Sequence, residues 1–71
     1  MTMTFGDRIR NRREELGLTQ TELAEKTKHQ QGYISRVERG KFEPTAPTII
    51  SLAVALEISA DELLGIERRT G

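Results

Sequence analysis

The side chains best suited to a recognisable chemistry lie between Gln30 and Lys41. The stretch contains two glutamines, a serine and three cations, together with a tyrosine and one acid. These residues are Gln30, Gln31, Ser35, Arg36, Arg39, Lys41, Tyr33 and Glu38. A glutamine amide suits the N6 and N7 atoms of adenine, and an arginine guanidinium suits O6 and N7 of guanine. Arginine and lysine also neutralise phosphate groups. The stretch therefore contains the groups that could hold and read a DNA duplex.

Other kinds of chemistry find little support in the composition. The 71 residues include no cysteine and one histidine, His29. Thiol catalysis, disulfides and thiolate metal sites are thus excluded, and a lone histidine is a poor metal site. We interpret His29 as a turn residue that covers the core. With no glycine-rich phosphate loop and with carboxylates spread over solvated faces, we expect no enzyme activity, no metal or other cofactor and no small-molecule ligand.

A short helix is predicted directly before the polar stretch. Thr19 and Glu22, three residues apart, form the pattern of a capping box. Leu18 and Leu23 bracket this pair at the spacing of a hydrophobic staple. The sequence therefore predicts a helix over 20–27.

A second short helix carries the polar stretch itself. Gln30 is a weak polar cap, and the apolar Ile34 and Val37 are three residues apart. Gly40 is suited to the left-handed conformation that closes a last turn. We predict a helix over 31–39, and two short helices joined by a tight turn form a helix-turn-helix.

Three flanking helices are predicted from caps and apolar spacing. Their expected ranges are 5–16, 46–56 and 60–64. The expected caps are Thr4 with Asp7, Thr45, and Ser59 with Glu62. The expected core face of the helix over 46–56 consists of Ile49, Ile50, Leu52, Ala53 and Leu56. The chain is therefore predicted to be all-α with five helices.

Several runs of residues resemble the Cro and phage-repressor (XRE-type) family of DNA-binding domains. They are Leu18-Thr19-Gln20, Glu22-Leu23-Ala24 and the run from Ile34 to Lys41, followed by Pro44-Thr45, Ile49 to Leu56 and Ile58 to Leu64. The resemblance covers nearly the whole chain. It implies a five-helix, lambda-repressor-like fold in a single domain, 1–71.

The resemblance also implies roles for individual residues. In such domains the third helix enters the major groove, while the second helix and the following loop hold phosphates. The positions that match base-reading places are Gln31, Gly32 and Arg36, with Ser35 beside them and Gln30 at the start of the helix. The positions that match phosphate-holding places are Gln20, Tyr33, Arg39 and Lys41. For Tyr33, packing within the protein is the alternative.

Three residues depart from the family pattern. Gly32 has no side chain with which to read a base, although it lets the helix approach DNA closely. The family usually has glycine at the position of Lys28 and often has glycine at the position of Glu57. Either Lys28 adopts a positive φ, at a cost of about 1–2 kcal/mol, or the turn differs from that of the family.

One arginine interrupts an apolar stripe in the first predicted helix. Phe5, Ile9, Arg13 and Leu16 share one helical face. The resemblance implies that Glu38 is the acid that pairs with Arg13 and ties the helices together. In the alternative, Arg13 snorkels to water and Glu38 joins an exposed cluster with Arg36, Arg39 and Lys41.

Charge is distributed unevenly although the formal net charge is zero. Residues 1–41 contain nine basic and six acidic residues, a net charge of +3, and residues 42–71 contain two basic and five acidic residues, a net charge of −3. This asymmetry fits one face that meets phosphates and another that meets solvent or a second subunit. Ordinary scatter in a short chain is the alternative.

The size of the chain favours self-association. A domain of 71 residues is near the lower limit for a single core without disulfides or metal. Three apolar residues remain once the core faces are assigned, namely Val54, Ala60 and Ile66, and we expect them to form a homodimer contact. The tail over 66–71 is expected to fray.

Neither a membrane span nor a signal peptide is recognisable, so we expect a cytoplasmic protein that does not bind membranes. The function expected is that of a sequence-specific transcriptional regulator of the repressor type, which binds double-stranded DNA at a near-palindromic operator as a homodimer. The alternative is a protein-interaction module, such as a toxin-neutralising partner (antitoxin) or a small helical adaptor.

Overall fold

The computed structural model describes residues 3–41 and 44–66, and within them it contains five helices and no strand. The helices are α1 (Phe5–Glu15), α2 (Gln20–Thr27), α3 (Gln31–Glu38), α4 (Ala46–Leu56) and α5 (Ala60–Leu64). This confirms the all-α fold expected from the sequence. The part of the tail over 67–71 that was expected to fray lies outside the described residues.

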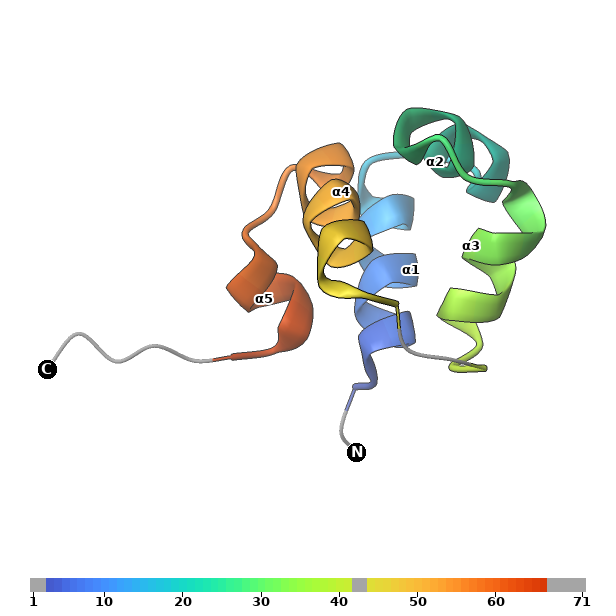
Figure 1. Cartoon of the computed structure of the whole chain (residues 1–71). Coiled ribbons are helices and arrows are strands. Elements are labelled where there is room, and N and C mark those ends of the chain that lie inside the picture. Colours follow the sequence, from blue (N-terminus) through green and yellow to red (C-terminus); the bar gives the residue numbers. More distant parts are fainter. Residues whose placement is uncertain (1–2, 42–43, 67–71) are drawn as a thin grey trace, which may run out of the picture.

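The helices surround α1, which contacts α3, α4 and α5. Figure 1 shows α2 and α3 on one side of α1 and α5 on the other, with α4 in front. The pair α2 and α3 forms the helix-turn-helix, and α4 supports it through α2. In the described part of the chain, no helix has the length and apolar character needed to cross a membrane.

Capping boxes begin the first two helices. The hydroxyl of Thr4 accepts a bond of 3.1 Å from the backbone N–H of Asp7, and the Asp7 carboxylate accepts one of 3.1 Å from Thr4. Thr19 and Glu22 make the same exchange at 3.1 and 2.9 Å. The hydrogen bonds from Thr19 hold the pKa of Glu22 below its ordinary value. These starts therefore follow from residue pairs that are close in the chain.

Of the other three expected caps, one makes its hydrogen bond and two do not. Ser59 accepts a hydrogen bond from the N–H of Glu62 at 3.0 Å. Gln30 and Thr45 stand at the N-cap positions of α3 and α4, but neither side chain bonds to the helix. The prediction that these two side chains cap their helices was therefore wrong. At α4, Pro47 removes one of the free N–H groups that a cap would otherwise satisfy.

Helices α1 and α3 end one residue earlier than predicted. Their last residues are Glu15 and Glu38, because Leu16 and Arg39 serve as C-caps. The chain then turns through Gly17 and Gly40, whose φ values are 71° and 72°. A positive φ is easy for glycine, which explains why both helices end at these points.

The turn between α2 and α3 contains a lysine in the left-handed conformation. Lys28 has φ 59°, and Glu57, after α4, has φ 57°. Behind Lys28, the backbone N–H of His29 donates to the carbonyl of Ala24 at 2.9 Å. The turn thus keeps the left-handed cap and places a strained lysine in it.

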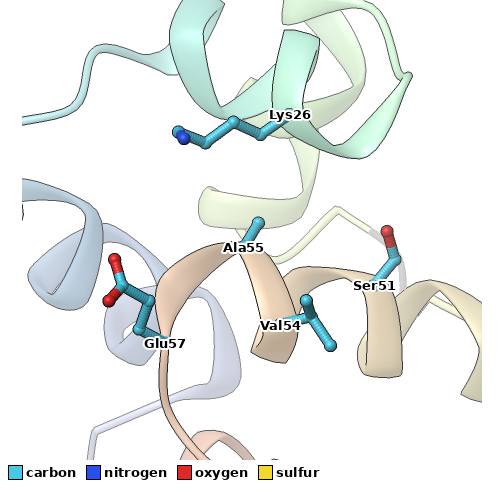
Figure 2. Close-up of a pocket in the computed structure, with 5 residues that line it drawn as sticks. All are labelled: Lys26, Ser51, Val54, Ala55 and Glu57. Atoms are coloured by element: carbon cyan, nitrogen blue, oxygen red, sulfur yellow. The ribbon is translucent and has the colours of Figure 1, made fainter.

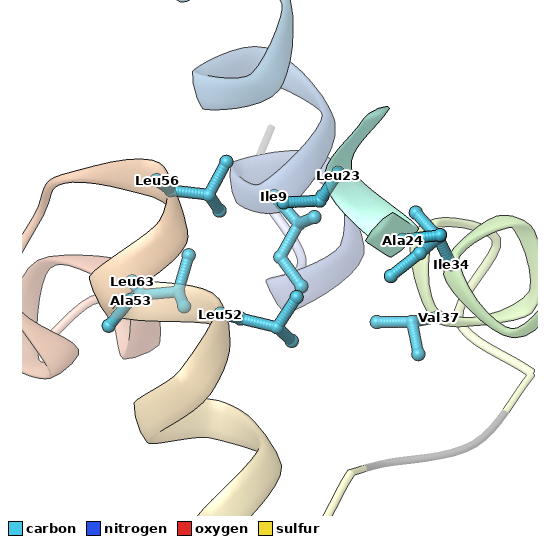
Figure 3. Packing of buried hydrophobic residues seen from close by; sticks show 9 residues of the cluster. All are labelled: Ile9, Leu23, Ala24, Ile34, Val37, Leu52, Ala53, Leu56 and Leu63. Carbon is cyan, nitrogen blue, oxygen red and sulfur yellow. The ribbon is translucent and has the colours of Figure 1, made fainter. Parts of the chain in front are cut away.

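The hydrophobic core draws on all five helices. It consists of Ile9, Leu23, Ala24, Ile34, Val37, Leu52, Ala53, Leu56 and Leu63, whose side chains converge in Figure 3. Ile50 was expected in this core, but it is 58% exposed. Leu52, Ala53 and Leu56 lie on the inner face of α4, and Ile50 projects roughly 110° away from the middle of that face because each residue advances about 100° around the helix.

Gly6 allows α1 to approach the end of α3. A Cβ atom at this position would overlap the backbone carbonyl oxygens of Val37 and Glu38. No larger residue fits without moving one of the two helices. No pattern in the sequence indicated this role for Gly6.

An ion pair joins α1 and α3 where they meet. The Arg13 guanidinium donates to the two carboxylate oxygens of Glu38 at 2.7 and 3.1 Å, and to the carbonyl of Leu18 at 2.9 Å. The two side chains are 12% and 2% exposed. The hydrogen bond to Glu38 raises the pKa of Arg13, although burial acts in the opposite direction. Arg13 therefore does not snorkel, and Glu38 is not part of an exposed cluster.

Replacing the left-handed Glu57 by glycine should stabilise the protein. We expect Glu57→Gly to raise the free energy of unfolding by about 0.5–1 kcal/mol, because glycine adopts positive φ without steric cost. The matched control is Glu25→Gly, on the exposed face of α2, which should lower it by about 0.5–1 kcal/mol. Urea unfolding measures both changes, and a loss of stability in both variants would contradict the effect of φ.

The Arg13–Glu38 pair should show strong coupling in a double-mutant cycle. Arg13→Ala and Glu38→Ala should each cost about 3–5 kcal/mol, because each leaves a buried charge without its partner. The double variant should cost much less than the sum of the two. Denaturant unfolding of the four proteins measures the coupling. Additive losses, each below about 1 kcal/mol, would mean that water screens the pair in solution.

Candidate nucleic-acid interface

The outer face of α3 is polar along its whole length. Ile34, Val37 and Glu38 face the interior, so the intervening residues face outward. Exposed positions on or beside the helix are Gln30, Gln31, Arg36, Arg39 and Lys41, whereas Gly32, Tyr33 and Ser35 are half-buried. The structure thus gathers eight of the nine residues for which DNA contacts were predicted, and the ninth, Gln20, begins α2.

The burial of Glu38 determines the charge of this face. Glu38 is the single acidic residue of α3, and its carboxylate turns inward to Arg13. Within residues 3–41 and 44–66, Arg36, Arg39 and Lys41 form no ion pair, whereas Arg10 and Arg12 pair with acids on α1. The outer face of α3 therefore carries cations and amides without a compensating carboxylate.

A chain of hydrogen bonds links the buried ion pair to the surface of α3. The Gln20 amide N–H donates to the Glu38 carboxylate at 3.0 Å. The Gln31 amide N–H donates in turn to the Gln20 carbonyl oxygen at 2.6 Å. From the sequence, Gln20 was expected to hold a phosphate and Gln31 to read a base, but the structure joins the two side chains. Their positions are therefore set by the ion pair beneath them.

The bound glutamines keep part of their hydrogen-bonding capacity. A glutamine amide has two N–H groups and a carbonyl oxygen with two lone pairs. Gln31 uses one N–H, which leaves its other N–H and its carbonyl oxygen. These are the two groups that adenine N7 and N6 require. The network consequently orients Gln31 without exhausting it.

No contact within the described part of the chain requires glycine at position 32. A Cβ atom there would lie 3.8 Å from Nη1 of Arg36, which is an ordinary contact distance. Gly32 also lacks the positive φ seen at Gly17, Gly40 and Gly65. Because glycine weakens a helix, its presence favours a close approach of α3 to another molecule.

An aromatic pair stands at the start of α3. The rings of His29 and Tyr33 are stacked, with centroids 4.3 Å apart and an interplanar angle of 12°. Tyr33 also packs against the core. This pair was not predicted from the sequence, although the separation of four positions was a signal that the two rings could meet.

The three expected dimer contacts differ in accessibility. Val54 is 73% exposed and Ile66 is 50% exposed. Ala60 is half-buried and packs against the core, so its side chain is largely occupied within the subunit. The exposed Ile50 lies four residues before Val54 and shares its helical face.

Comparison with known proteins places this geometry in a family. The helix-turn-helix family model matches residues 9–63. The chain is 38% identical over 65 residues to the immunity repressor protein of Bacillus phage phi105, an alignment that covers 92% of this chain and 45% of the repressor. The chain thus spans less than half the length of that relative.

Solved structures agree with this assignment. The P22 c2 repressor, in complex with a synthetic operator, matches with a TM-score of 0.86 and 35% identity, over 93% of this chain and all of that one (100%). SinR, the master regulator for biofilm formation, in complex with DNA, matches with a TM-score of 0.82 and 32% identity, over 86% of this chain and 98% of that one. The chain therefore belongs to the helix-turn-helix family, in its phage-repressor type.

Proposed function

We propose that this chain is a sequence-specific DNA-binding transcriptional regulator of the repressor type, which acts in the cytoplasm and has no catalytic activity. The observation that carries the proposal is the outer face of α3, where cations and amides stand without a carboxylate because Glu38 is buried beneath them. Such a face matches the edges of bases and the phosphates beside them. Membership of a family of named repressors and regulators supports the same function.

In the proposed complex α3 lies in the major groove. Gln31 contacts adenine with the N–H and carbonyl that its bond to Gln20 leaves available. Arg36 is exposed five positions after Gln31 and contacts guanine, and the half-buried Ser35 lies beside it. Gly32 lets the helix backbone approach the bases. Gln30, exposed at the N-cap, adds a contact at the entry of the helix.

Phosphates of the DNA backbone would be held on both sides of α3. Gln20 stands at the first position of α2, where free backbone N–H groups also attract an anion. Arg39 and Lys41 follow the end of α3, and both are exposed. Tyr33, half-buried near the start of the helix, is a further candidate for a phosphate contact. These contacts position the protein, and the base contacts select the sequence.

We also propose that the chain binds a near-palindromic operator as a homodimer. The proposed contact is the apolar stripe of α4, which consists of Ile50 and Val54. These side chains are 58% and 73% exposed, so a second subunit would remove apolar surface from water. Figure 2 shows Val54 beside Ser51 and Ala55, with Lys26 of α2 across from them. These residues, with Glu57, line a concavity of about 440 Å³. Ile66, at 50% exposure, is a second candidate contact.

Arginine substitutions should separate base reading from phosphate binding. Arg36→Ala should weaken binding to the preferred operator by roughly 1–3 kcal/mol and relax the preference at one base pair. Arg39→Ala should weaken binding to all sequences alike and reduce the slope of log affinity against log salt by about one unit. Each change removes one positive charge, so each variant is the control for the other.

The measurement uses operator and scrambled duplexes at several salt concentrations, after the operator has been selected from a random DNA pool. Equal, sequence-independent losses in both variants would contradict the placement of α3 in the groove. If the parent protein shows no salt-dependent binding to DNA, a function as a protein-interaction module becomes the better proposal.

The homodimer should depend on the outer stripe of α4. We expect Val54→Glu to convert a dimer into an 8.0 kDa monomer at tens of micromolar, because a carboxylate in an apolar contact loses its hydration. Asn11→Glu, on the exposed side of α1, introduces the same charge elsewhere and should leave the dimer intact. Sedimentation of both variants and the parent measures this. A monomeric parent, both free and on a palindromic operator, would contradict the proposal.

A further inference from the structure

A shallow concavity lies where the turn between α2 and α3 meets the start of α3. Its volume is about 310 Å³, and its lining consists of Lys28, His29, Gln30, Tyr33 and Arg36. Two of these side chains are cations, and the others offer ring nitrogens, an amide and a phenol. None of the five is a carboxylate, so the composition suits an anionic group.

The imidazole of His29 is held at this site with its polar edge uncovered. The backbone N–H of His29 is anchored to the Ala24 carbonyl at 2.9 Å. Its ring lies 4.3 Å from that of Tyr33 and nearly parallel to it. Ring nitrogens point within the plane of the imidazole, so stacking covers one face and leaves them accessible. Within residues 3–41 and 44–66, neither nitrogen has a hydrogen-bond partner.

Lys28 contributes charge from an unusual backbone position. Its φ of 59° would suit glycine better, and its side chain is exposed. A left-handed residue ends many helices, and the one that ends α2 brings a positive charge to the turn. Lys28 makes no ion pair within the described part of the chain, so its charge remains available to a ligand.

We propose that this concavity binds one phosphate of the DNA backbone, with an N–H of His29 as hydrogen-bond donor and Lys28 as the nearby charge. The proposal rests on the proposed function and adds to it two residues for which the sequence predicted no DNA contact. When the start of α3 enters the major groove, the turn that precedes it lies beside the strand that borders the groove. A phosphate there would be clamped between the turn and the first turn of α3.

The test combines protein variants with neutral phosphates. Operator duplexes are prepared with one phosphate at a time replaced by an uncharged methylphosphonate. In each half-site, one of these substitutions should neutralise the phosphate that binds in the concavity. That substitution should weaken binding of the parent about tenfold, as expected for the loss of a charge-assisted hydrogen bond. His29→Phe keeps the stacked ring without its nitrogens, and Lys28→Asn removes the charge with a residue that tolerates positive φ.

Both variants should bind the unmodified operator several-fold more weakly and should lose their sensitivity to the methylphosphonate at that position. The matched control is Arg10→Asn, since Arg10 is an exposed cation of α1 that lines neither this concavity nor the one beside α4. This control should bind like the parent. Circular dichroism and urea unfolding establish that all variants are folded.

The outcomes distinguish this inference from the proposed function. If the parent binds its operator and both His29→Phe and Lys28→Asn bind it equally well, the phosphate site is wrong and the regulator remains. If the variants bind weakly but keep the methylphosphonate sensitivity of the parent, the loss has another origin and the site is again wrong. A parent that binds no duplex would overturn both proposals.

Discussion

The buried ion pair between Arg13 and Glu38 is the interaction on which the interface depends. The pair joins α1 to α3. The guanidinium also donates a hydrogen bond to the Leu18 carbonyl, which precedes α2. Burying a charge is costly unless it is paired and hydrogen-bonded, and here the carboxylate also accepts a bond from Gln20. The same burial removes the acid from the outer face of α3. One pair therefore orients the helix and determines the sign of its surface.

Close packing around this pair sets the position of α3. Gly6 brings α1 against the carbonyl groups of Val37 and Glu38, where a side chain would not fit. At the other end of α3, the left-handed Lys28 sets the direction in which the chain leaves α2. Packing thus holds α3 at both ends, which suits the proposed fit of this helix to the groove of DNA.

Much of the fold could be predicted because its signals are local or periodic. The capping boxes at Thr4 and Thr19 join residues three apart in the chain, so they are recognisable without a structure. The inward positions of Leu23, Ala24 and Thr27 follow from helical spacing. Errors arose where composition alone was ambiguous. The apolar Ile50 was predicted to lie in the core but is exposed. The polar Gln30 was predicted to cap α3, but its side chain makes no hydrogen bond to the helix.

The sequence by itself determined the five helices, the family and the set of polar residues on the third helix, because these depend on order and spacing along the chain. Only the tertiary structure decided which of these residues act together. The bonds from Gln31 to Gln20 and from Gln20 to Glu38 cross 11 and 18 positions of the chain. Contacts of this range depend on distances in space, which packing of the helices sets and no local pattern encodes.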